Sequence, residues 1–148
     1  MTQPSEFSRD SEQILQELRF ELTESYDHGM HKSFEWKNET MILGLIYDRG
    51  YYECYVLPHK KPFENLGLIR LLRFINDDPK FYEKELIDAN LSYCLPINDY
   101  IALFNKNYDL ISDFFSCYTP ETFNRYEKYE FHYNGLCCRL PIFSTVQK

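Results

Sequence analysis

The sequence has few glycines and lacks the short motifs of nucleotide-binding and hydrolytic enzymes. Only 5 of its 148 residues are glycine, and they form no loop that could hold a phosphate. No P-loop, dinucleotide fingerprint, H-E-x-x-H or G-x-S-x-G is present. We therefore expect no cofactor and no enzyme activity that depends on these motifs.

Long apolar runs are also missing. No stretch approaches the roughly 18 uninterrupted apolar residues that a membrane-spanning helix requires. Residues 1–10 are polar and have no apolar centre, so they do not resemble a signal peptide. These absences favour a soluble cytoplasmic protein that does not associate with membranes.

The five cysteines show neither a disulfide framework nor a zinc pattern. Their number is odd, no C-x-x-C pair occurs, and two of them are adjacent: Cys54, Cys94, Cys117, Cys137 and Cys138. Only His28-x-x-His31 has a spacing close to that of zinc ligands, and it falls in a glycine-containing link. We predict buried, reduced thiols and no metal site.

What the chain does have is negative charge and many aromatic residues. The formal net charge of −7 and the pI near 5.1 argue against nucleic-acid binding. The charge either keeps the protein soluble or attracts a basic partner. There are 13 tyrosines, more than a core readily satisfies because each buried hydroxyl needs a partner. We expect exposed rings at Tyr51, Tyr55, Tyr93 and Tyr133.

Three consecutive segments have the character of β-strands. Residues 31–37 alternate, residues 41–47 are almost wholly apolar, and residues 51–57 are aromatic and β-branched. Two-residue loops at Asn38-Glu39 and Arg49-Gly50 would join them into a meander.

The two loops can be tested against each other because the side-chain period of a strand is two. The first loop places Phe34 opposite Leu43, and the second places Leu45 opposite Cys54. Both choices gather one apolar set on a single face: Phe34, Trp36, Leu43, Leu45, Tyr47, Tyr52, Cys54 and Val56. The other face is mixed, with Tyr55 opposite Gly44, where its ring can cover the missing side chain.

The remaining segments have helical periodicity. Asp10 and Gln13 form a possible capping box, after which apolar residues at helical spacing predict a helix over 10–26. Further helices are expected over 65–76, from Asp78-Pro79, from Asn98 with a break near 105–107, and from Thr119-Pro120. The pattern predicts an α+β fold, an antiparallel three-stranded meander covered on one face by about four or five helices. Residues 136–146 are a possible edge strand. We expect a single domain over 1–148, with residues 1–9 flexible.

Three groups of residues could in principle support chemistry. A Cys–His pair could meet in space, and Glu35 and Glu53 could act as paired carboxylates on the mixed face. Arg70 and Arg73 share a stripe of an otherwise apolar helix, where they need carboxylate partners, reach solvent or hold an anion. A structural role is the more economical interpretation for each group.

The order of elements resembles that of small bacterial immunity proteins, which are encoded beside polymorphic or contact-dependent toxins. The resemblance runs over residues 10–118, and its one motif of letters is Tyr47 to Cys54, with Asp48-Arg49-Gly50 at its turn. It implies an acidic cytoplasmic protein that neutralises one cognate toxin by binding it, with no catalytic residues.

We therefore expect a non-enzymatic binding protein, an immunity protein whose partner is a cognate protein toxin, for example a basic nuclease. The expected contact residues are Glu35, Glu53 and Tyr55 on the mixed sheet face, with Asp109 and Asp113 as a second acidic choice. The protein is expected to be a monomer or a homodimer. The alternatives are a small enzyme with a Cys or carboxylate site, or an accessory subunit of a larger assembly.

Overall fold

The structure is a computed structural model that describes residues 1–59, 66–91 and 94–134. The chain forms two compact units. The first consists of Met1–Leu68 with Cys94–Ser116, and the second of Ile69–Tyr93 with Cys117–Lys148. The expected single domain over 1–148 stays a prediction, and the possible edge strand over 136–146 lies outside the described residues.

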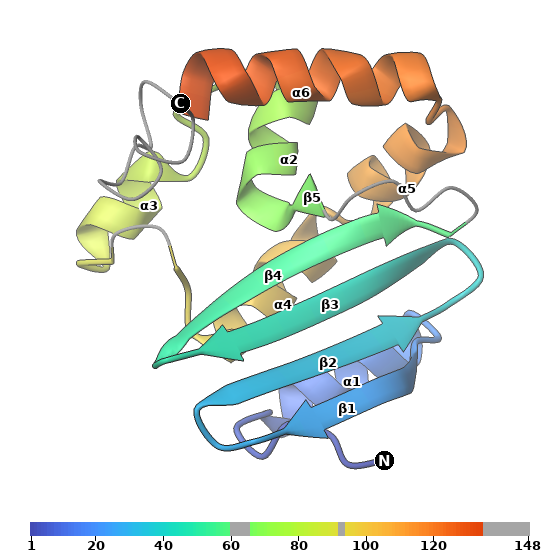
Figure 1. The fold of residues 1–148 in the computed structure, drawn as a ribbon, viewed down its shortest axis with the longest axis vertical. Helices are drawn as coiled ribbons and strands as arrows, with labels where there is room; N and C mark the ends of the chain where they lie inside the picture. Colours follow the sequence, from blue (N-terminus) through green and yellow to red (C-terminus); the bar gives the residue numbers. More distant parts are fainter. Residues whose placement is uncertain (60–65, 92–93, 135–148) are drawn as a thin grey trace. The chain divides into compact units, whose positions relative to one another are not determined.

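The first unit contains an antiparallel five-stranded sheet in the order β1-β2-β3-β4-β5 (Figure 1). The α+β class is confirmed, with more strands than expected. The strands are β1 (Glu21–Asp27), β2 (His31–Lys37), β3 (Met41–Asp48), β4 (Tyr51–Pro58) and β5 (Leu66–Gly67). The helices of this unit are α1 (Arg9–Glu17), α4 (Ile97–Lys106) and α5 (Tyr108–Ser116).

The N-terminal helix is shorter than its periodicity predicted. The helix expected over 10–26 ends at Glu17, and β1 follows it. Arg19 has a left-handed φ of 63°, so the chain leaves the helix there and Phe20 enters the core. The predicted cap was also wrong. Ser8 precedes α1, and its hydroxyl accepts a hydrogen bond from the Ser11 N–H.

The β3–β4 hairpin has the predicted register. Leu45 lies opposite Cys54, and Asp48 opposite Tyr51. Arg49 and Gly50 both have positive φ, as a type I′ turn requires.

The β2–β3 register differs from the prediction by two residues. Phe34 lies opposite Leu45 rather than Leu43. The Asn38 carboxamide oxygen accepts hydrogen bonds from the Thr40 and Met41 N–H groups, and this arrangement lengthens the loop. A shift of two leaves every side chain on its predicted face.

The predicted apolar face is the core of the first unit. Trp36, Leu43, Leu45 and Val56 are completely buried, and Figure 1 shows α1 and α4 behind the sheet. The Tyr100 hydroxyl of α4 donates a hydrogen bond to the Tyr52 carbonyl. Burial raises the pKa of Tyr100 above its ordinary value.

Residues 2–8 make contacts that the sequence did not predict. The Trp36 indole N–H donates to Gln3, and the Phe7 ring stacks on Trp36. Asn98 was expected to begin its helix, but it is the second residue of α4, and its side chain does not cap that helix. Instead it accepts from the Ser8 N–H and the Ser11 hydroxyl, so it joins α4 to the start of α1.

The second unit contains α3 (Glu83–Asp88), α6 (Pro120–Asn134) and most of α2 (Leu68–Ile75). The Phe74 ring meets the rings of Tyr126 and Tyr129 edge to face, and the Tyr129 hydroxyl donates to the Arg73 carbonyl. Burial and the nearby Glu127 raise the pKa of Tyr118 to about 12. The helix α6 begins at Pro120 as predicted. The start predicted at Asp78-Pro79 was wrong, because α3 begins only at Glu83, after a turn that ends with Tyr82 in the left-handed conformation. None of the described helices is both long and apolar enough to cross a membrane.

Candidate functional site

The outer face of the sheet consists of the β1–β4 side chains that alternate with the core residues. Strand register arranges them in rows across the sheet. Ile42 and Leu57, at one end of this face, are buried. The residues of the outer face are Glu21, Glu24, Tyr26, His31, Ser33, Glu35, Lys37, Ile42, Gly44, Ile46, Asp48, Tyr51, Glu53, Tyr55 and Leu57.

Tyr55 is fixed at the middle of the outer face. Its ring lies over Gly44, the residue directly opposite on β3, so closely that a Cβ added there would come within 2.0 Å of the Tyr55 Cζ. On its other side Tyr55 pairs with Gly67 of β5. The predicted covering of Gly44 by this ring is therefore confirmed, and glycine is required there for space.

The Tyr55 hydroxyl completes the arrangement by donating a hydrogen bond to Glu35 Oε2 at 2.8 Å. The bond crosses β3, because Glu35 pairs with Gly44 from the other side. Burial raises the pKa of Tyr55, and the bond to Glu35 raises it further. The ring is half-buried rather than exposed as expected, because it rests on the backbone of β3.

Glu53 lies on β4 in the next row, opposite Ile46, and it is exposed. Glu24 lies directly opposite Glu35 on β1. The structure thus places the predicted residues Glu35, Glu53 and Tyr55 on one face. Acidic side chains outnumber lysines and arginines on the outer face. Lys37 is the one lysine among the outer-face residues named above, and the carboxylates are Glu21, Glu24, Glu35, Asp48 and Glu53.

Asp109 and Asp113 lie one turn apart on α5, and both are exposed. Within residues 1–59, 66–91 and 94–134 no hydrogen bond or ion pair joins them to Glu35, Glu53 or Tyr55. The two acidic groups that the sequence singled out are therefore not bonded to each other in the described part of the chain.

The structure places three exposed apolar side chains at the end of the outer face where the β1–β2 and β3–β4 turns meet. Met30 is 70% exposed, Tyr51 66% and Tyr26 43%. The Arg49 N–H donates to the Met30 carbonyl, which joins the β1–β2 turn to the β3–β4 turn. We call Tyr26, Met30 and Tyr51 the tip patch. Tyr51 was expected to be exposed, whereas Tyr26 had been assigned to a helix.

The groups considered for chemistry have other surroundings. Cys54 is buried, and burial raises the pKa of its thiol, so it is a poor nucleophile. The prediction of buried thiols was wrong for two other described cysteines, since Cys94 is half-buried and Cys117 is exposed. No group of three potential metal ligands forms among the described residues. The His28 ring stacks on Tyr26.

Arg73 is buried, and its Nε donates to the Phe81 carbonyl. Cys137, Cys138 and Tyr93 lie outside the described residues, as does the side chain of Tyr133.

Comparisons with protein-family models, with curated proteins and with solved structures found no match for this chain.

Proposed function

We propose that this protein is a non-enzymatic binding protein of the bacterial cytoplasm that neutralises a cognate toxin by covering it with the outer face of its sheet. The observation that carries the proposal is the Tyr55–Glu35 pair above Gly44. An aromatic ring held in one orientation on an accessible face loses little conformational freedom when a partner covers it. Tyrosine is also among the residues that most often dominate binding energy.

The surroundings of Tyr55 suit a basic partner. The exposed Glu24 lies opposite the half-buried Glu35, and the exposed Glu53 lies on β4 in the row next to Tyr55, so the face carries negative charge around a central ring. Such charge speeds the encounter with a cationic protein and orients it, while the central contact supplies most of the affinity. A basic toxin such as a nuclease fits this description.

The tip patch extends the same surface. Tyr51 and Tyr26 belong to outer-face rows, and Met30 lies in the adjoining turn. Exposed aromatic and methionine side chains are enriched at protein interfaces. We place the edge of the contact surface at this patch, with Tyr55 near its centre.

A growth assay tests the function itself. The resemblance implies that the toxin is encoded beside this gene, so the protein encoded immediately upstream is expressed alone and together with this chain. Growth arrest by the upstream protein and full recovery on coexpression would support the proposal. Absence of arrest, or arrest that persists on coexpression, would contradict it.

The same assay identifies the surface. Glu53→Lys combined with Tyr55→Ala should abolish protection, whereas Asp109→Lys combined with Asp113→Lys on α5 should leave it intact. A single Glu12→Lys on the exposed side of α1 controls for a general change of charge. Circular dichroism and thermal melting show whether each variant is folded. Protection lost only in the α5 variant would move the site to Asp109 and Asp113.

A further inference from the structure

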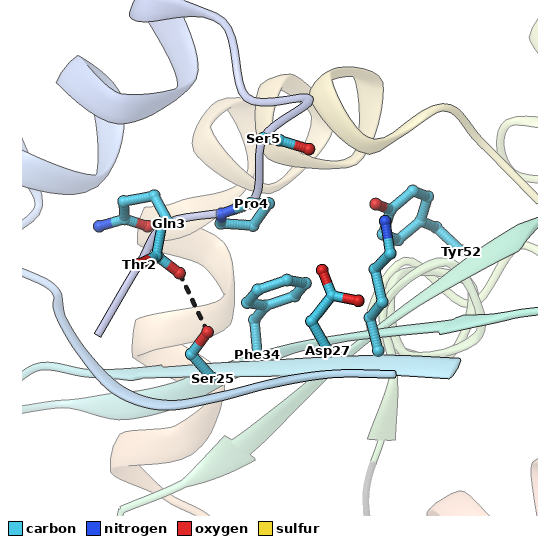
Figure 2. A pocket seen from close by; sticks show the side chains of 9 residues that line it. Thr2, Gln3, Pro4, Ser5, Ser25, Asp27, Phe34 and Tyr52 are labelled. Carbon is cyan, nitrogen blue, oxygen red and sulfur yellow. Dashed lines mark hydrogen bonds between the residues drawn. The ribbon is translucent and has the colours of Figure 1, made fainter. Parts of the chain in front are cut away.

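A small pocket lies on the core side of the sheet, and its described lining residues belong to the strands or to residues 2–5. Its volume is about 120 Å³. Phe34 of β2 forms its base, and Asp27 of β1 and Tyr52 of β4 stand at one side, as Figure 2 shows. Lys32 of β2 completes that wall, and residues 2–5 pass over the pocket.

The segment over the pocket is attached at several points. The Ser25 hydroxyl donates to the Thr2 carbonyl at 3.0 Å (Figure 2). The Trp36 indole N–H donates to Gln3 Oε1 at 3.0 Å, and the Tyr52 hydroxyl donates to Glu6 Oε1 at 2.5 Å. Hydrogen bonds on both sides of residues 4–5 therefore hold this segment in place over the pocket.

The wall carries one charge of each sign, and the two charges are not paired with each other. Asp27 and Lys32 are direct cross-strand partners. Within the described part of the chain, however, no ion pair joins them. Asp27 Oδ1 accepts from the Gly29 N–H at 2.8 Å, and the Lys32 ammonium lies 5.0 Å from the centre of the Tyr47 ring. One carboxylate oxygen and the ammonium donors are thus available to a ligand.

The volume limits the size of that ligand. A cavity of about 150 Å³ accepts benzene, which has six heavy atoms. A pocket of about 120 Å³ therefore suits a molecule of similar or smaller size. A ligand that satisfied both charges would need an ammonium and a carboxylate close together, since Asp27 and Lys32 are neighbours in the register.

We propose that this pocket binds a small zwitterion, the ammonium and carboxylate of a free α-amino acid with a short side chain. Asp27 accepts from the ammonium, Lys32 donates to the carboxylate, and the Phe34 ring contacts the aliphatic part. This site is independent of the proposed toxin-binding face, because its residues lie on the opposite side of the sheet.

Titration followed by ¹H–¹⁵N NMR tests the proposal with L-alanine as the probe. Saturable shifts are expected at the amides of Ser25, Asp27, Lys32 and Phe34. Propionate and ethylamine each carry only one of the two charges, so each should bind at least about tenfold more weakly, the change that follows from losing one charge-assisted contact. Equal affinity for propionate and L-alanine would overturn the two-charge assignment, and no saturable shift with L-alanine would overturn the site.

Two conservative variants and two matched controls locate the binding. Asp27→Asn keeps an acceptor for the Gly29 N–H, and Lys32→Met keeps the aliphatic stem, so both should fold and both should lose at least about tenfold in L-alanine affinity. Glu24→Gln and Lys37→Met change the same kinds of charge on the outer face of the same two strands and should bind normally. Unchanged affinity in Asp27→Asn and Lys32→Met would contradict the proposal.

Discussion

The two faces of the sheet are built from alternate residues of the same strands, yet different interactions order them. On the core side, Trp36, Leu43 and Val56 are fully buried, and packing accounts for their positions. On the outer face, a single hydrogen bond from Tyr55 to Glu35 holds a ring against Gly44. Burial explains the side-chain positions on the core side. On the outer face, a polar interaction orders side chains that solvent still reaches.

The largest expected effect contrasts the two faces directly. Trp36→Ala should lower the free energy of unfolding by roughly 3–5 kcal/mol, because it removes a completely buried ring from between Phe7 and Phe34. Tyr55→Ala should cost only about 1–2 kcal/mol, because its ring is half-buried. Urea denaturation of both variants measures the difference. Equal losses would mean that the outer face also serves as core.

A second prediction concerns the space above Gly44. Gly44→Ala places a Cβ within 2.0 Å of the Tyr55 ring, so the ring must move and the bond to Glu35 must break. We expect a loss of about 1–3 kcal/mol in the free energy of unfolding.

The same substitution should be nearly silent when Tyr55 is already alanine, because the collision is then gone. A double-mutant cycle with Gly44→Ala and Tyr55→Ala measures this coupling. Additive losses would show that the contact between the ring and the glycine does not order the outer face.

A third, smaller effect isolates the hydrogen bond. Tyr55→Phe keeps the ring over Gly44 but removes the hydroxyl that donates to Glu35. The expected loss is about 0.5–1.5 kcal/mol by urea denaturation. Tyr51→Phe is the matched control, since its ring is 66% exposed, and it should change nothing measurable.

The smallest effect is a change in alkaline sensitivity. The pKa values of Tyr52, Tyr55 and Tyr100 are raised above 10.0, with burial as the first cause in each case. A raised pKa in the folded state means that the unfolded chain loses its phenolic protons first. The stability that these protonated tyrosines contribute is therefore fully present below pH 10, and it is lost as the pH rises above 10. Tyr55→Phe should reduce this slope in denaturation curves measured above pH 10, while an unchanged slope would mean that Tyr55 does not contribute.

The faces were predictable because alternation has a period of two, which survives errors of detail. The loop at Asn38 shifted the β2–β3 register by two residues, yet Phe34 stayed on the core side. The position of Tyr55 over Gly44 followed from the β3–β4 turn alone. The bond to Glu35 could not be foreseen, because the predicted register put β2 out of line with Gly44.

Other parts of the structure depend on contacts that the sequence pattern does not contain. Leu18 and Leu22 fit a helical stripe, so β1 was predicted as helix, and only the left-handed residue Arg19 separates α1 from β1. The tip patch was missed because Tyr26 fell within the helix predicted over 10–26. Residues 2–7 have no helical or strand periodicity, and their attachment to Trp36 and Tyr52 comes from tertiary hydrogen bonds and from the stacking of Phe7 on Trp36.

The most direct test of the outer face as a binding surface is calorimetric titration of this protein with the protein encoded immediately upstream, which the proposed function takes to be the toxin. Glu53→Lys with Tyr55→Ala should weaken the complex by several kcal/mol, as central interface residues do, while Asp109→Lys with Asp113→Lys should bind like the unaltered protein. Unchanged affinity in the Glu53/Tyr55 variant would contradict the account.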